Sequence, residues 1–288
     1  MARRRILALI ASLGLAVTAF AAPAAAITDG NVDGNTHPSV GMLLFYTADG
    51  RFRCSGTLVS PTVVLTAAHC TDGTIGKTMV TFDTTIALQP PSRLPEAEDS
   101  AAGFDGTEKA PSGIAVQYGE AHTAPGYSNF TDLRNWNDYA VVVLDQPAPA
   151  SIPVAQLAPR DYLDQFRPNV LNSTLFTFVG YGTEVRKPET GPQNPTPFSY
   201  PLIRRNTTSP GQKLTPQILQ TNGNGKDRRG EGGTCFGDSG GPGFQGGYVV
   251  SVVSYGYTSN CRYLDGHQRV DIGVAQQWLA TFDVFPAQ

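Results

Sequence analysis

The sequence is short of charge and of cysteine, and both shortages narrow the classes of protein it can encode. Charged residues occupy 16% of the 288 positions, and the formal net charge is −3. Nucleic-acid-binding domains carry a strong basic excess, so the composition does not indicate a nucleic-acid partner. The four cysteines include no Cys-x-x-Cys pair, which argues against a structural zinc site. No repeat of fixed short period is present, so a repeat architecture is not indicated.

Long hydrophobic runs are also scarce, and the one that stands out lies at the amino terminus. It covers residues 6–20 and follows three arginines, Arg3 to Arg5. A membrane-spanning helix needs roughly 20 apolar residues, so this run is too short to be one. A basic start, an apolar middle and small residues at the end are typical of a secretory signal peptide. The sequence predicts this signal over residues 1–26, or over residues 1–21 followed by a short propeptide. We therefore expect a secreted, extracellular protein with no membrane partner.

Neither the cysteines nor the acidic residues predict a bound metal. In an oxidising environment the cysteines are expected to pair, and four cysteines allow three connectivities. The acidic stretch at Glu96, Glu98 and Asp99 is a conceivable calcium site, but it lacks a recognisable ligand pattern. We expect a solvated loop there, and no metal or other cofactor.

Residues 27–288 have the patterning of an all-β protein. Short runs of β-branched and aromatic residues are separated by turn-forming residues, supplied by 31 glycines and 22 prolines. The predicted strands are Val40–Tyr46, Gly56–Ser60, Thr62–Thr66, Tyr139–Leu144, Leu175–Gly180 and Tyr248–Ser254. Residues 88–112, 183–215 and 222–233 are predicted to be loops. Many short strands joined by long loops favour a sandwich or a barrel.

Only the carboxyl terminus has helical periodicity. Asp271 is placed to cap a helix at its amino-terminal end. An apolar face follows at Val274, Trp278, Leu279 and Phe282. We therefore expect one helix over residues 271–283.

Three segments carry residue types that serve nucleophilic catalysis. Thr66-Ala-Ala-His69-Cys70 ends a predicted strand in a turn of small residues, and Asp138 directly precedes an apolar strand. Gly237-Asp-Ser239-Gly-Gly-Pro242 places a serine among glycines, where backbone amides can approach a substrate. A serine hydroxyl is a weak nucleophile and needs a base such as histidine. Each residue alone has an ordinary structural interpretation, so the weight rests on the three motifs together.

Together the three segments resemble the chymotrypsin/trypsin-type serine proteases. The order histidine, aspartate, serine is the order of that family, and Ser254-Tyr255-Gly256 matches it beyond the serine. A Gly-x-Ser-x-Gly motif also occurs in α/β-hydrolases. That interpretation fails because His69 precedes Ser239 and no alternating strand–helix pattern is present.

The resemblance implies a fold and a reaction. The fold is all-β, with two six-stranded antiparallel Greek-key barrels, at about residues 27–150 and 151–270, and the C-terminal helix. The reaction is peptide-bond hydrolysis through an acyl-enzyme, with Ser239 as nucleophile, His69 as acid–base and Asp138 orienting the histidine. The amides of Gly237 and Ser239 are expected to form the oxyanion hole. The implied partners are protein or peptide substrates and protein protease inhibitors, and we expect a monomer. A catalytically silent binding protein and an esterase remain alternatives.

The resemblance also implies two disulfides and a role for a new amino terminus. The disulfides are Cys54–Cys70 and Cys235–Cys261. In the family, a freed N-terminal ammonium pairs with the aspartate before the catalytic serine, here Asp238, and Ile27 is the candidate terminus. Cleavage after Ala26 would create this terminus directly, whereas cleavage after Ala21 would require a further step.

Specificity is expected to reside in a pocket next to Ser239. The floor position is Gly233, where trypsin-like members carry aspartate, and the other positions that match the family pocket are Thr234, Phe236, Ser254, Tyr255 and Gly256. An uncharged, open pocket favours an apolar or aromatic residue before the scissile bond. The alternative is that Asp265 reaches the pocket from the opposite wall and restores a preference for lysine or arginine. The Leu-Asp-Gly context of Asp265 instead suggests a solvated turn, which is the interpretation we favour.

Overall fold

The structure is a computed structural model, and it describes residues 27, 30–111, 113–132, 134–185 and 198–288. The predicted signal segment, residues 1–26, lies outside these ranges. No helix within them has both the length and the apolar content needed to cross a membrane.

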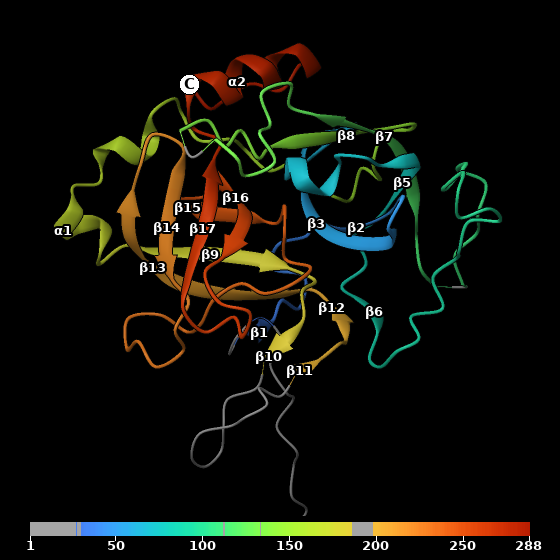
Figure 1. Ribbon diagram of the computed structural model, residues 1–288, viewed down its shortest axis with the longest axis horizontal. Coiled ribbons are helices and arrows are strands. Elements are labelled where there is room, and N and C mark those ends of the chain that lie inside the picture. The colour runs from blue at the N-terminus through green and yellow to red at the C-terminus, as the bar shows by residue number, and fades with distance from the viewer. Residues whose placement is uncertain (1–26, 28–29, 112, 133, 186–197) are drawn as a thin grey trace, which may run out of the picture.

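Two closed antiparallel barrels form the bulk of the fold (Figure 1). The first contains, in order around the barrel, β2 (Val40–Thr47), β3 (Gly50–Ser60), β4 (Val63–Thr66), β8 (Ala140–Leu144), β7 (Gln117–Thr123) and β5 (Ile75–Thr81). The second contains β13 (Arg205–Leu214), β14 (Ile218–Asn222), β17 (Leu264–Arg269), β16 (Tyr248–Gly256), β15 (Pro242–Gln245) and β9 (Leu175–Gly180). Pairing of β2 with β5 closes the first barrel, and pairing of β13 with β9 closes the second. Both barrels have the same Greek-key order of strands, and the predicted fold class is confirmed.

Short elements connect and flank the barrels. The short strands are β1 (Asn31–Val32), β6 (Thr85–Ala87), β10 (Glu184–Val185), β11 (Phe198–Ser199) and β12 (Leu202–Ile203). The helical elements are η1 (Ala68–Cys70), η2 (Tyr162–Gln165), α1 (Pro168–Leu171), α2 (Gly273–Leu279) and η3 (Ala280–Phe282).

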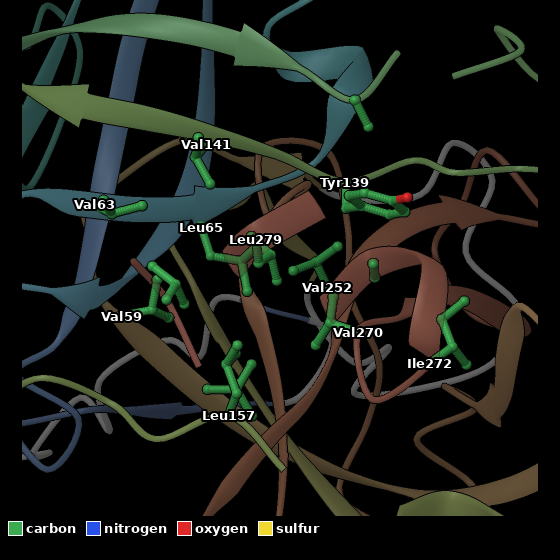
Figure 2. Close-up of a cluster of buried hydrophobic side chains, with 14 residues drawn as sticks. Val59, Val63, Leu65, Tyr139, Val141, Leu157, Val252, Val270, Ile272 and Leu279 are labelled. Atoms are coloured by element: carbon green, nitrogen blue, oxygen red, sulfur yellow. The ribbon is translucent and has the colours of Figure 1, made fainter. Parts of the chain in front are cut away.

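A shared hydrophobic core fixes the two barrels against each other (Figure 2). The first barrel contributes Val59, Val63, Leu65 and Val141. The second barrel, or the residue that follows it, contributes Val249, Val252 and Val270, and α2 contributes Ala275 and Leu279. Burial of this apolar surface holds the barrels together with the helix. This shared core sets the relative position of the two barrels, on which a site built from both barrels depends.

A buried ion pair attaches the amino-terminal segment to the second barrel. The Arg204 side chain is fully buried, and its Nε lies 3.0 Å from Asp33 Oδ2. Arg204 also donates to the carbonyls of Val40 and Phe82, and Asp33 accepts from Asn206. Every charged atom of this pair thus has partners, as a buried ion pair requires. The network anchors the chain a few residues after Ile27.

The prediction that residues 183–215 form a loop is wrong, because this range contains the ten-residue strand β13. β13 pairs with β9 through six residues and closes the second barrel. Its residues are mostly Thr, Ser, Gly, Pro and charged, so it lacks the apolar alternation that identifies a strand. Barrel closure supplies the hydrogen bonds that stabilise it. The barrel strands β5, β7, β14, β15 and β17 were also not predicted.

The C-terminal helix is present, but its predicted cap and face need correction. The N-cap is Ile272, not Asp271, and it makes no side-chain cap hydrogen bond. The Asp271 carboxylate is buried and instead accepts from Arg269 and from the amide of Leu163. Val274 is 48% exposed, so it does not belong to the buried face that Leu279 occupies.

Candidate active site

His69 and Asp138 form a hydrogen-bonded pair at one edge of the first barrel. His69 lies in η1, and the Cys54–Cys70 disulfide joins this turn to β3. His69 Nδ1 lies 2.9 Å from Asp138 Oδ2, and the His69 amide donates to Asp138 Oδ1 at 2.9 Å. The imidazole keeps some solvent access while the carboxylate is fully buried. The carboxylate therefore fixes both the ring and the backbone of His69.

The second barrel completes the environment of Asp138. Ser254 Oγ, on β16, donates to Asp138 Oδ2 at 2.6 Å, and the amide of Asp138 donates to Gln268 Oε1 on β17 at 3.0 Å. The sequence assigned Ser254 only to the pocket, and nothing in the sequence marked Gln268. Both roles depend on a contact between barrels, which the local sequence does not encode.

Ser239 lies in a loop held against β3. The amide of Ser55 donates to the Ser239 carbonyl at 2.8 Å, and Ser55 Oγ donates to the Gly237 carbonyl at 2.9 Å. Gly237 and Gly240 have φ of +95° and +76°, a region that favours glycine. Within the part of the chain that the structure describes, the amides of Gly237 and Ser239 have no hydrogen-bond acceptor. Two unpaired amide donors therefore lie at the serine.

Asp238 is buried directly behind this loop. Its carboxylate accepts from the amides of Gly182 at 2.8 Å and Cys235 at 2.9 Å. Burial raises the pKa of Asp238 to about 7, and the two hydrogen bonds and the Arg53 charge offset only part of that rise. Ile27 is also fully buried. In the full-length chain the Ile27 nitrogen is an amide and carries no charge.

A cavity of about 360 Å³ opens beside Ser239. Of the predicted pocket residues, Thr234, Phe236, Ser254, Tyr255 and Gly256 line it, together with Cys235 and Cys261 of the second disulfide. Gly233 is not in this lining. It packs behind the wall, because a β-carbon on Gly233 would lie 2.6 Å from Asp265 Oδ2.

The favoured interpretation of Asp265 as a solvated turn is wrong. Asp265 lies on β17, is 3% exposed, and belongs to the lining of this cavity. Its Oδ2 accepts from the amide of Thr234 at 2.8 Å. Burial, together with the nearby Asp238, raises the pKa of Asp265 to about 7. The Leu-Asp-Gly segment resembles a turn locally, but strand pairing places its carboxylate inside the barrel wall.

Aromatic rings border the cleft on the side of His69. Phe130 lies 5.8 Å from the His69 ring, 5.3 Å from Trp136 and 6.5 Å from Tyr255, between ring centroids. Trp136 stacks on Tyr255 at 5.0 Å. Nothing in the sequence marked Phe130 or Trp136, because they lie in a loop without a periodic pattern or a motif. Phe130 therefore covers part of one side of the His69 ring.

Three potential metal-binding atoms lie within 4.8 Å of one another, and they belong to Cys54, His69 and Cys70. The two sulfurs are bonded to each other in the Cys54–Cys70 disulfide. Neither is therefore a thiolate, the form that binds metals. Both disulfides, Cys54–Cys70 and Cys235–Cys261, have the pairing implied by the resemblance.

The chain belongs to the trypsin family, whose model matches residues 30–279. Trypsin alpha of Drosophila erecta is 24% identical over 241 residues, covering 80% of this chain and 77% of the relative. The thrombin-like enzyme acutin of Deinagkistrodon acutus is 29% identical over 227 residues, covering 75% and 78%.

Solved structures of the same fold include proteins named for different activities. A collagenase structure has a TM-score of 0.59 at 20% identity and covers 88% of this chain and 96% of its own. Human heparin binding protein has a TM-score of 0.57 at 17% identity and covers 91% and 100%. At such identity the likeness shows the fold alone, so the activity has to be argued from the site.

The glycines facing Asp238 yield a stability prediction. A β-carbon on Gly182 would lie 2.3 Å from Asp238 Oδ2, so Gly182→Ala should lower the free energy of unfolding by about 1–3 kcal/mol or more. Gly256→Ala is the control, because its β-carbon would meet nothing nearer than 3.6 Å, and a change within about 0.5 kcal/mol is expected. Urea denaturation measures both, and equal destabilisation would contradict the packing argument.

Proposed function

We propose that this chain is a secreted serine endopeptidase that hydrolyses peptide bonds in proteins. The observation that carries the proposal is the His69–Asp138 pair beside Ser239, with two unpaired amides at the serine. His69 and Ser239 line one cavity. We expect the mature enzyme to act as a monomer and to be blocked by protein inhibitors that occupy the cleft.

The proposed mechanism assigns one task to each group. His69 takes the Ser239 proton as the hydroxyl oxygen attacks the carbonyl carbon, and the amides of Gly237 and Ser239 stabilise the oxyanion that forms. His69 then gives the proton to the leaving amine, and an acyl-enzyme remains until water hydrolyses it. Asp138 holds the ring by its Nδ1 and stabilises the imidazolium, with its own orientation fixed by Ser254.

The alternative of a catalytically silent binding protein predicts an unreactive serine. We expect a fluorophosphonate to label the processed wild-type protein and not Ser239→Ala, which should also lose at least about 10⁴-fold in kcat/KM. Ser259→Ala is a matched control, because Ser259 lines the pocket beside Ser239 but has no adjacent base, and it should label normally. Folded, processed wild-type protein that resists labelling would contradict the proposal. Cleavage of esters without cleavage of peptides would favour the esterase.

We further propose that the α-ammonium of Ile27 pairs with Asp238. Both residues are buried, and burial raises the pKa of Asp238 to about 7. A cation brought to this carboxylate would favour its ionised form and would order the adjacent loop that carries Ser239.

Protein that begins at Ile27 should therefore be more active than protein that begins at Ala22. Losing a buried pair costs about 3–5 kcal/mol, so a loss of about a hundredfold or more in kcat/KM is expected with the longer terminus. An Ile27→Val protein that begins at the same position keeps the ammonium and serves as the control. Sequencing the amino terminus of active secreted protein is decisive: full activity from a chain that starts at Ala22 would exclude direct activation.

The pocket beside Ser239 is proposed to accept two kinds of side chain. With Asp265 protonated, the uncharged pocket suits the apolar or aromatic residue expected from the sequence. With Asp265 ionised, it offers a carboxylate to lysine or arginine. Among the described residues that line this cavity, Asp265 is the one acidic group.

The choice between these substrates should depend on pH. Because the pKa of Asp265 is raised to about 7, the carboxylate is neutral below that pH and charged above it. The kcat/KM ratio of an arginine peptide to the matching phenylalanine peptide should rise about tenfold from about pH 5.5 to about pH 8.5. Taking the ratio cancels the pH dependence of the catalytic step, which both substrates share. Asp265→Asn should flatten the rise, and a flat ratio in the wild type would contradict the role of Asp265.

A further inference from the structure

Two cavities share Ser239 in their lining, and we assign them to opposite sides of the scissile bond. The pocket that contains Asp265 does not include His69, whereas a second cavity of about 420 Å³ includes both His69 and Ser239. In the proposed mechanism His69 gives its proton to the leaving amine. The second cavity therefore faces the part of the substrate that follows the scissile bond. Its wall includes Phe45 and Phe52, whose ring centroids are 6.3 Å apart, and Arg53.

Arg53 is a sheltered cation with few partners. It lies on β3, and a β-carbon on Gly237 would be 2.9 Å from Arg53 Nε, so the guanidinium runs beside the serine loop. The one side-chain hydrogen bond it makes within the described residues is long, 3.4 Å from Nη2 to Thr183 Oγ1. Burial lowers the pKa of Arg53, and the nearby Asp238 carboxylate offsets part of this effect. Most of its donors are free to meet a ligand.

The other charges at this cavity differ from Arg53 in exposure. Asp49 and Asp72 also line it, and both are exposed. Water and salt screen exposed charges strongly, whereas a sheltered charge keeps more of its field. The Asp238 carboxylate is already held by the amides of Gly182 and Cys235. An anion from solution would thus meet the guanidinium as the dominant charge at the inner wall.

We infer that Arg53 forms a binding subsite for a carboxylate on the leaving-group side of the substrate, carried by the first or second residue after the scissile bond. The inference rests on the proposed protease function. A guanidinium offers paired donors that match the two oxygens of a carboxylate. The carboxylate can be an acidic side chain or the free carboxyl end of a short substrate. The enzyme would then favour cleavage before acidic residues or near a chain end.

Partitioning of the acyl-enzyme tests this subsite without involving the other pocket. A neutral ester forms the acyl-enzyme, and dipeptide nucleophiles then compete with water for it. The set is Ala-Glu amide, Ala-Gln amide, Glu-Ala amide, Gln-Ala amide, and Ala-Gln with a free carboxyl end. We expect the acyl-enzyme to react about five- to tenfold faster with Ala-Glu amide or Glu-Ala amide than with the matching glutamine dipeptide amide. The comparison of Ala-Gln with its amide separates the chain-end source from the side-chain source.

Arg53→Gln should abolish this preference, and Arg53→Lys should keep part of it. Arg51→Gln is the matched control: Arg51 lies on the same strand, but its guanidinium bonds to Glu96 and to the Pro95 carbonyl instead of lining the cavity. The preference is a ratio of two aminolysis rates from the same acyl-enzyme, so a moderate change in acylation caused by losing the Arg53 charge near Asp238 cancels from it. Loss of ester hydrolysis together with the preference would assign Arg53 to support of the serine loop and overturn the subsite.

The two proposals fail in distinguishable ways. No acyl-enzyme in processed wild-type protein would contradict the proposed function itself. An acyl-enzyme that shows no preference for carboxylate nucleophiles, or the same preference in Arg53→Gln, would overturn only the subsite.

Discussion

The structure depends most on one buried carboxylate, that of Asp138, which both barrels hold. The first barrel supplies the aspartate, two residues before β8, and the histidine that it orients. The second barrel supplies Ser254 and Gln268, which fix the carboxylate and its backbone. A charge that is removed from water needs such partners, or it destabilises the protein. The shared apolar core keeps the barrels in the relative position that these hydrogen bonds require. The contacts that join the two barrels therefore also build the surroundings of Asp138.

Two further buried carboxylates surround the serine loop, and each lies in a different environment. Asp238 accepts from two amides and feels the Arg53 charge, but burial outweighs them and its pKa rises to about 7. Asp265 meets the Thr234 amide and faces a cavity, so its charge is available to whatever enters. Residue type alone cannot distinguish these carboxylates. The number of donors, the neighbouring charges and the contact with a cavity are the differences on which the separate roles proposed for them rest.

Much of the fold followed from the sequence, and the failures have physical reasons. The apolar strands were located correctly because burial requires β-branched runs bounded by turns, as in β2 and β9. The polar strand β13 was missed because its stability comes from barrel closure, not from its side chains. Asp265 was placed in a turn because Leu-Asp-Gly has a local turn pattern, whereas β17 pairs on both sides and buries it. The cap at Asp271 failed for a similar reason: Arg269 holds its carboxylate.

The sequence by itself determined the family resemblance, both disulfide pairings that the resemblance implied, and the three motifs that carry His69, Asp138 and Ser239. It did so because strand patterning and short motifs are local properties of the chain. Only the tertiary structure decided that Ser254 and Gln268 hold Asp138, that Asp265 enters the pocket wall, and that Arg53 lies beside Gly237. These are contacts between residues far apart in the chain, and they arise from how two closed barrels pack. Their geometry depends on distances across the cleft, which no local pattern of residues records.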